Sequence, residues 1–201
     1  MPPKVKITKE SILDASLDMI IKKGYPAVNI KSVAQALGCS TQPVSWQFGN
    51  MENFREELLN AAVGYANKKM TSNDADPLKT LWHIGIAYID LAVNEPNLFR
   101  FVYMGESGIY HRGGFSSMTA DKGNADLIER LCSDLSVDKD KIETFVQRLI
   151  IYTHGIASLL TAGVIHADKM TAVRMLHQFA SEQLERIGAN IDTSYLLEEA
   201  I

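Results

Sequence analysis

The chain has 201 residues, 46% of them hydrophobic, so it can bury a core and form one small and one larger domain. Its net charge of −4 argues against a protein coated with positive charge for binding nucleic acid. The charge is uneven, however, because six lysines and three acidic residues give the first 50 residues +3 and leave −7 for the rest. A basic N-terminal part and an acidic remainder suit a protein that contacts the phosphates of nucleic acid at one end. Ordinary variation of surface charge also fits such small charge differences.

The two cysteines, Cys39 and Cys132, lie neither in a CxxC motif nor beside a histidine pair. Their spacing therefore predicts neither a disulfide framework nor a zinc site. The first residues, MPPKVKITKES, contain no apolar stretch of signal-peptide length. We therefore expect a cytoplasmic protein.

The first predicted helix begins near Thr8, whose side chain can cap it, and closes at Gly24. Small or apolar residues recur between them at helical spacing: Ile12, Ala15, Ser16, Met19 and Ile20. This pattern predicts a helix with one face against a core.

The segment from Asn29 to Phe48, NIKSVAQALGCSTQPVSWQF, predicts two short helices joined by a glycine turn. Asn29 is a good N-cap for the first helix. An apolar stripe follows it at helical spacing: Ile30, Val33, Ala34 and Leu37. Gly38 suits the left-handed position that ends a helix, and Ser40 is an N-cap for the next one.

The second of these helices has a polar and aromatic outer face. Pro43 is tolerated because it lies in the first turn, where its missing N–H has no partner to lose. Val44 and Phe48, one turn apart, face inward and leave four side chains outside: Thr41, Gln42, Ser45 and Trp46. Such a pair of helices is typical of a helix-turn-helix that reads the major groove, although an αα-hairpin in any helical domain also fits.

Asn50 can cap a further helix carrying Phe54, Leu58, Ala61, Ala62 and Tyr65. With these flanks, the segment from about Lys6 to Val63 resembles the N-terminal domain of the tetracycline-repressor-like (TetR) family of transcriptional regulators. The landmarks of the resemblance follow one another without a gap: Ile12-Leu13-x-Ala15, Gly24-Tyr25, Val33-Ala34, Gly38-x-Ser40 and Trp46-x-Phe48. Their joint spacing is far more specific than any single landmark.

The resemblance implies an all-α homodimeric regulator, and we expect a repressor that binds a double-stranded DNA operator. The two-fold axis of the dimer would make the operator an inverted repeat. The candidates for base contacts are Thr41, Gln42 and Trp46. The remaining candidate DNA-binding residues, expected mainly at phosphates, are Asn29, Lys31, Ser32, Ser40, Ser45 and Gln47.

The chain departs from the family pattern at three positions. Ser45 stands where a tyrosine is common, and Gln47 where a histidine or similar residue often precedes the phenylalanine. Met51 replaces the lysine that usually opens the fourth helix, so the phosphate contact there could pass to backbone N–H groups at the helix start. We therefore expect a weaker affinity or an unusual operator, with the same fold.

The chain beyond Tyr65 is predicted to remain helical. Residues 73–77 form a turn-rich break, and a helix follows that stops before Pro96. Asn97 can cap a shorter helix, and the glycine-rich residues 105–117 predict a loop. A further helix is defined by Leu127, Ile128, Leu131 and Leu135.

Two last helices are predicted around Tyr152–Ile165 and Met170–Leu184, and the first is similar to the helix that builds the dimer in the family. Their polar residues make a membrane span a poor interpretation of the apolar run between Arg148 and Asp168. Small residues would let another helix approach: Gly155, Ala157, Ser158, Ala162 and Gly163. We expect half of an intersubunit four-helix bundle, with a core internal to one chain as the alternative.

An enzyme is the rival class. The sequence contains no GxSxG, no HExxH, no phosphate-binding glycine loop and no GxGxxG after a strand. The five histidines are scattered, so that a metal site would need distant helices. We expect no catalysis, no cofactor and no metal.

An effector pocket is expected among the aromatic and methionine side chains of the C-terminal part, because ligand pockets are mostly apolar with a few polar groups. The candidate ligand-binding residues are Trp82, Tyr103, Phe145, Tyr152 and His154, within a group that also includes Tyr88, Phe99 and Met104. We expect a small, largely apolar effector that releases the DNA. Residues 6–66 would bind DNA, and residues 75–190 would dimerise and hold the effector.

Overall fold

The computed structural model describes residues 7–109 and 122–198, and every regular element in these two ranges is a helix. The predicted all-α fold is confirmed. The part of the predicted loop 105–117 that begins at residue 110 lies outside the described residues. Within the two ranges, no helix combines the length and the apolar character that a membrane span requires.

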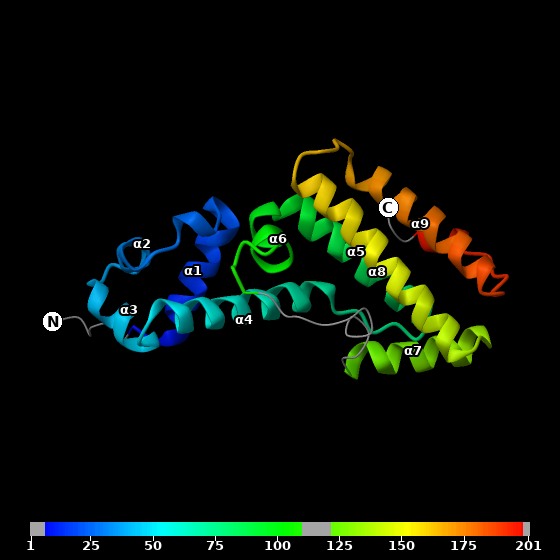
Figure 1. Cartoon of the computed structure of the whole chain (residues 1–201), viewed down its shortest axis with the longest axis horizontal. Coiled ribbons are helices and arrows are strands. Elements are labelled where there is room, and N and C mark those ends of the chain that lie inside the picture. Colours follow the sequence, from blue (N-terminus) through cyan, green and yellow to red (C-terminus); the bar gives the residue numbers. More distant parts are fainter. Residues whose placement is uncertain (1–6, 110–121, 199–201) are drawn as a thin grey trace. The chain divides into compact units, whose positions relative to one another are not determined.

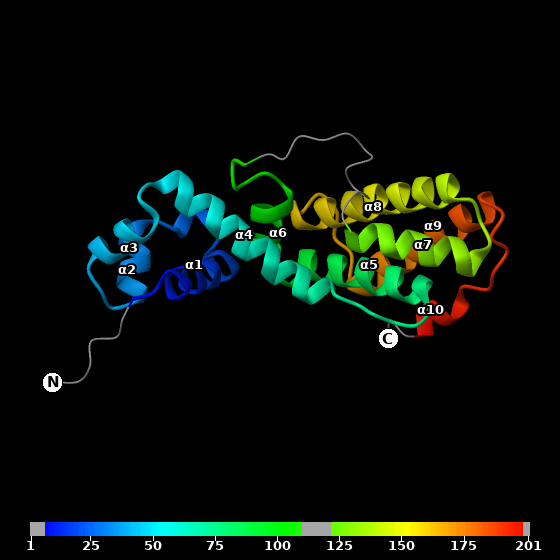
Figure 2. The same ribbon diagram turned by 90° about the horizontal axis from the view of Figure 1, so that it is seen from below.

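Figure 1 and Figure 2 show these helices in two views. In chain order they are α1 (Lys9–Lys23), the 3-10 turn η1 (Tyr25–Ala27), α2 (Ile30–Ala36), α3 (Thr41–Phe48), α4 (Met51–Met70), α5 (Pro77–Asn94), α6 (Pro96–Tyr103), α7 (Lys122–Leu135), α8 (Lys139–Thr161), α9 (Lys169–Arg186) and α10 (Ser194–Glu198).

The chain forms two compact units. The first unit contains Met1–Lys68 and Glu95–Tyr110, and the second contains Lys69–Asn94 and His111–Ile201. The sequence suggested two continuous parts, whereas the first unit is built from two separate stretches. Helix α6 follows α5 in the chain but groups with α1, because the two helices pack on each other.

Helix α1 is capped at both ends as its sequence predicts. Thr8 Oγ1 accepts a hydrogen bond from Ser11 N at 3.2 Å, and Ser11 Oγ accepts one from Thr8 N at 3.1 Å. Ile12 and Ile20 are fully buried. Gly24 ends the helix with a φ of +82°, which glycine adopts without the steric cost of a Cβ. The α1 boundaries therefore follow from local chemistry.

The start of α6 differs from the expectation. The sequence predicts Asn97 as its N-cap, but the helix begins at Pro96, with Glu95 in the capping position. The Asn97 side chain instead donates from Nδ2 to the carbonyl of Ile21 at 3.1 Å and accepts a bond from Arg100 at 2.5 Å. The predicted cap is wrong, and Asn97 joins α6 to the end of α1.

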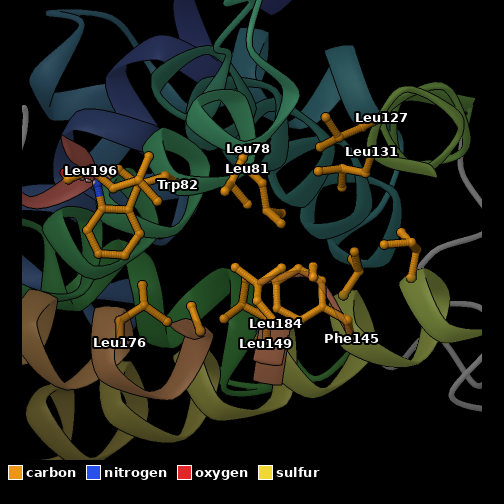
Figure 3. Packing of buried hydrophobic residues seen from close by; sticks show 14 of the residues in the cluster. Leu78, Leu81, Trp82, Leu127, Leu131, Phe145, Leu149, Leu176, Leu184 and Leu196 are labelled. Atoms are coloured by element: carbon orange, nitrogen blue, oxygen red, sulfur yellow. Dashed lines mark hydrogen bonds between the residues drawn. The ribbon is translucent and has the colours of Figure 1, made fainter. Parts of the chain in front are cut away.

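The core of the second unit is formed mainly by α5, α7, α8 and α9. Figure 3 shows leucines of α5, α8 and α9 pointing into this core. Gly85 lets α9 come close to α5, since a Cβ there would lie only 3.0 Å from Leu176 Cδ2. A larger residue in the middle of α5 would therefore require the Leu176 side chain to shift.

The C-terminal helices begin and end at slightly different residues than predicted. Helix α8 ends at Thr161 rather than near Ile165, and Gly163 then leads the chain away with a φ of +69°. Asp168 Oδ1 caps α9 by accepting from Thr171 N at 2.7 Å. The short helix α10 was not predicted, because five residues are too few to show a periodic pattern.

Candidate functional site

Helix α2 begins with a capping box formed by two of the candidate DNA-binding residues. Asn29 Oδ1 accepts a hydrogen bond from Ser32 N, and Ser32 Oγ accepts one from Asn29 N, both at 3.0 Å. Ser32 Oγ also donates to the carbonyl of Ala27 at 2.8 Å. The predicted cap at Asn29 is confirmed, and the pair fixes the start of α2.

The turn between α2 and α3 is made by Gly38, whose φ of +63° is the left-handed conformation that the sequence predicts. Ser40 is the N-cap residue of α3, but its side chain makes no capping hydrogen bond. The Ser40 side chain is exposed, so it does not serve the helix start as the Asn29 side chain does.

The two faces of α3 differ as the sequence predicts. Val44 is 2% exposed and Phe48 6% exposed, and the Phe48 ring meets the Phe54 ring of α4 edge-on at 4.9 Å. The outward row of exposed side chains comprises Thr41, Gln42, Ser45 and Trp46. Trp46 is 77% exposed, so a partner that covered its indole would gain the free energy of burying that apolar surface.

Two of the candidate phosphate contacts also bind the backbone. Ser45 Oγ donates to the carbonyl of Thr41 at 3.2 Å, and Gln47 Nε2 donates to the carbonyl of Ile7 at 3.3 Å. Gln47 therefore ties Ile7, the first described residue, to the end of α3. Lys31 is exposed on α2.

The start of α4 lies directly after α3 in the sequence. Asn50 Oδ1 accepts a hydrogen bond from Asn53 N at 2.8 Å, which confirms the predicted cap. Met51, where the family usually has a lysine, is 38% exposed. The N–H groups of this first turn carry partial positive charge and can bind an anion without a lysine.

A further set of residues in the first unit was missed by the sequence analysis. Arg55 Nε donates to the Tyr25 hydroxyl at 2.9 Å, and the Tyr25 ring packs against Phe101 of α6 at 4.8 Å. The Tyr65 hydroxyl donates to Glu95 Oε1 at 3.1 Å. Because these partners are distant in the sequence, only the Gly24-Tyr25 landmark could have drawn attention to them. They fix α6 on the helices of the first unit.

Two of the candidate ligand-binding residues are core residues of the second unit. Trp82 is 3% exposed and Phe145 1% exposed. Trp82 Nε1 donates to the carbonyl of Leu196 at 2.6 Å, and its ring meets His177 edge-on at 5.7 Å. The polar atom of Trp82 is therefore used within the protein.

Tyr152 and His154 have different surroundings, since residues two apart on a helix do not share a face. The Tyr152 ring stacks on Phe179 of α9, with the centroids 4.0 Å apart and the planes 5° apart. His154 reaches towards α5, where the Tyr88 hydroxyl lies 2.8 Å from Nδ1. Ser158 Oγ lies 3.2 Å from His154 Nε2. Tyr88, His154 and Ser158 form what we term the polar cluster.

The imidazole of the polar cluster favours its neutral form. Burial lowers the pKa of His154, because the charged ring loses hydration. A neutral imidazole has one donor and one acceptor nitrogen. One of the two hydroxyls, of Tyr88 or Ser158, therefore donates a hydrogen bond to the ring, and the other accepts one from it. The polar cluster therefore carries no fixed charge when the imidazole is neutral.

Tyr103 belongs to α6 and to the first unit. Burial raises the pKa of its phenol to about 12. The five candidate ligand-binding residues thus fall into several groups: two in the core, one stacked between α8 and α9, one in the polar cluster, and Tyr103 in the other unit.

Helices α8 and α9 carry exposed apolar side chains that we term the α8–α9 face: Ile151, Leu159 and Met175. Gly155 has open space where a Cβ would point. Ala157, in contrast, is fully buried within its own unit. The expectation that Ala157 faces a partner helix is wrong, because it lies on the core side of α8.

Residues 12–58 match the family model of the bacterial regulatory proteins, tetR family. A relative from Bacillus subtilis (strain 168), the uncharacterized HTH-type transcriptional regulator YvkB, is 27% identical over 105 residues. The match covers 47% of this chain and 56% of that relative.

Solved structures share the fold. A tetR-family regulator from Streptomyces coelicolor has a TM-score of 0.61 at 17% identity, covering 96% of this chain and 90% of its own. A TetR variant from Acinetobacter baumannii AYE, in complex with minocycline, has a TM-score of 0.58 at 13% identity, covering 90% and 98%. At these identities the likeness concerns the fold alone.

Two short helices joined by a left-handed glycine, the second with a buried and an exposed face, form a helix-turn-helix. The N-terminal helix-turn-helix domain is that of the TetR family of bacterial regulatory proteins, whose members are DNA-binding transcriptional regulators and not enzymes. The resemblance seen in the sequence is confirmed. Among the described residues, no group of three histidine, cysteine or acidic side chains is arranged to hold a metal ion.

Proposed function

We propose that this protein is a homodimeric repressor that binds an inverted-repeat operator through α3 and is released by a small, largely apolar effector. The observation that carries this proposal is the exposed row Thr41, Gln42 and Trp46 on a helix whose opposite side is buried. Thr41 and Gln42 would bind base edges, and Trp46 a thymine methyl group. A chromosomal operator would place the protein in the cytoplasm.

The phosphate contacts are assigned to residues around this row. Lys31 would supply a charge, and Ser40, Ser45 and Gln47 would donate hydrogen bonds. The Asn29–Ser32 capping box would chiefly hold α2 against the backbone, since its bonds already serve the helix start. The first turn of α4 would add backbone N–H groups where Met51 replaces a lysine.

The dimer would form through the α8–α9 face of two copies. Ile151, Leu159 and Met175 expose apolar surface there, and close contact at Gly155 would let the helices of two copies approach. Such a contact has two-fold symmetry, so the two α3 helices would read the same sequence in opposite directions. An inverted repeat follows from that symmetry.

The effector would bind in the second unit at the polar cluster. Tyr88, His154 and Ser158 offer hydrogen bonds without a fixed charge, next to a largely apolar core. A neutral molecule with one or two polar groups fits this environment better than a sugar or a nucleotide. One structural relative, the TetR variant from Acinetobacter baumannii AYE, was solved in complex with minocycline.

Two chain connections would carry the effector signal. Helix α4 is continuous from Met51 to Met70, and α6 follows α5 after a single residue, Glu95, that is not helical. The contacts of α6 with α1 and η1 would let a shift of α5 reach the reading helix. An effector that lowers DNA affinity must bind the DNA-free form better by the same factor.

Selection of bound fragments from a random DNA pool tests the proposal. The enriched sequences should contain an inverted repeat, and Thr41→Ala or Gln42→Ala should relax the preference at single positions by about 1–3 kcal/mol per lost base contact. Failure to enrich any sequence at low salt would overturn the function.

A thermal-shift screen with apolar compounds, followed by operator release, tests the effector. Compounds that stabilise the protein without releasing DNA would contradict induction.

A further inference from the structure

The segment of residues 189–198, which includes α10, is held against the rest of the second unit by buried side chains and polar contacts. Ala189 and Leu196 are 3% and 2% exposed. The carbonyl of Leu196 accepts the indole N–H of Trp82 at 2.6 Å. We term this segment the C-terminal strap.

The strap binds the first turn of α5 through a tyrosine. The Tyr195 hydroxyl donates to Asp76 Oδ2 at 3.0 Å, and Lys79 Nζ lies 5.5 Å from the centre of the Tyr195 ring. The other oxygen of Asp76 accepts from Leu78 N at 2.8 Å and from Lys79 N at 3.1 Å. One carboxylate thus caps α5 and receives the strap.

The loop between α4 and α5 is held at the same place from a second side. Arg130 of α7 donates to the carbonyl of Asp74 at 2.6 Å and to that of Ala75 at 3.0 Å. The buried Thr80 hydroxyl binds the backbone of Asp74 and of Asp76. Residues 74–76, directly before α5, are therefore fixed by α5, α7 and the strap.

The other end of the strap is bound to α9. His177 Nε2 lies 2.8 Å from the carbonyl of Thr193, which requires the ring to donate. The Ser181 hydroxyl lies 2.7 Å from Thr193 Oγ1. The contact of the strap with α9, at Thr193, and its contact with Asp76, at Tyr195, are thus only two residues apart in the chain.

We propose that the C-terminal strap is a conformational device that couples the dimer helix α9 to the loop after α4, and so fixes the spacing of half-sites that the dimer accepts. Tyr195 is the positioning residue. The inference rests on the proposed function, since spacing has a meaning only for a dimer on an inverted repeat. The strap itself contacts neither DNA nor effector.

The physical reason is the geometry of the double helix. Moving one half-site by a single base pair rotates it by roughly 35° about the DNA axis. A dimer with a fixed loop before α5 rejects operators whose half-sites are moved in this way, because its two α3 helices cannot enter their half-sites at the same time. A dimer with a released loop accepts them, and its affinity for the best operator falls because the loop must be ordered on binding.

The experiment compares the full-length protein with Tyr195→Phe on the selected operator and on versions with one base pair added or removed between the half-sites. Tyr195→Phe should reduce the discrimination against the altered spacings by about fivefold, the equilibrium equivalent of one neutral hydrogen bond. The matched control is Thr161→Val, which removes a hydroxyl bound to the Ala92 carbonyl at the opposite end of α5. This control should keep the discrimination of the wild type.

Trp82 fluorescence reports whether the strap remains bound, because the Trp82 indole contacts it. The chain has two tryptophans, so this measurement is made in a Trp46→Phe background. If Tyr195→Phe keeps the wild-type discrimination, the inference is overturned while the DNA-binding function stands. If it loses affinity equally for all spacings, Tyr195 is only structural and the inference is also overturned. Absence of any operator for the wild type would instead refute the proposed function.

Discussion

Asn29 and Ser40 stand at equivalent positions, one before each helix of the helix-turn-helix, yet their side chains have different roles. Asn29 completes a capping box with Ser32, whereas Ser40 makes no capping hydrogen bond. Residue type alone does not distinguish them, because asparagine and serine are both favoured at the N-cap. The difference has a measurable consequence for stability.

Asn29→Ala should lower the free energy of unfolding by about 1 kcal/mol, because it leaves N–H groups at the start of α2 without a side-chain acceptor. Ser40→Ala, the matched control, should change stability much less. Urea unfolding at fixed temperature measures both variants. Equal losses would show that the hydroxyl of Ser40 caps α3 in solution.

The neutral imidazole of His154 gives a pH dependence of known sign. Burial lowers its pKa below the ordinary value of 6.5. Between the lowered pKa and pH 6.5, the unfolded chain therefore binds more protons than the folded chain. The stability that this group contributes is present above pH 6.5 and is lost as the pH falls towards the lowered pKa.

His154→Gln keeps hydrogen-bonding groups for Tyr88 and Ser158 but cannot titrate. The loss of stability between about pH 7.5 and about pH 5.5 should therefore be smaller in this variant than in the wild type. Ser133→Gln, which adds the same side chain at an exposed position outside the polar cluster, is the control and should retain the wild-type dependence. Parallel pH profiles for wild type and His154→Gln would refute the role of His154.

At the scale of elements, α8 has opposite faces with different tasks. Ala157 lies on the core side and is fully buried, while Leu159, two residues further on, is 43% exposed. A stripe of small residues in the sequence does not show which of them face outward. The structure separates a packing residue from a residue available to a second copy.

Leu159→Glu should convert the proposed dimer into a folded monomer, because it places a charge in an interface that would exclude water. Ser133→Glu, on the exposed side of α7, is the matched control and should leave the mass in solution unchanged. Sedimentation and circular dichroism together distinguish a monomer from an unfolded chain. A Leu159→Glu protein with the full dimer mass would exclude the α8–α9 face as the interface.

At the scale of the whole molecule, the charge is divided between a basic beginning and an acidic remainder. The net charge of −4 means that long-range attraction to DNA is not a property of the entire surface. In the proposed function, binding depends on local contacts at α2 and α3, so we expect individual lysines to have a large share in the salt dependence.

Lys31→Ala should weaken binding to all DNA sequences alike and reduce the slope of log K against log salt by about 0.9. Lys139→Ala, which makes the same change of charge at an exposed site in the second unit, should leave the slope unaltered. Fluorescence anisotropy with labelled operator over a salt series measures both. An unchanged slope for Lys31→Ala would remove it from the phosphate contacts.

Much of the helix-turn-helix could be predicted because its determinants are local. The Asn29 cap, the left-handed Gly38, and the inward Val44 and Phe48 all act within one or two helical turns. The contacts that fix α6 could not be predicted in this way. Asn97 binds Ile21, and Arg55 binds Tyr25, across distances in sequence that no periodic pattern encodes.

The sequence by itself determined the all-helical class, the TetR-like helix-turn-helix and the exposed row of its second helix, since capping, glycine conformation and apolar spacing are properties of short segments. Only the tertiary structure decided that α6 joins the first unit, that Ala157 is a core residue, and that His154 pairs with Tyr88. It also decided that a short C-terminal helix holds the start of α5. These features depend on which distant segments meet, and packing of whole helices determines that.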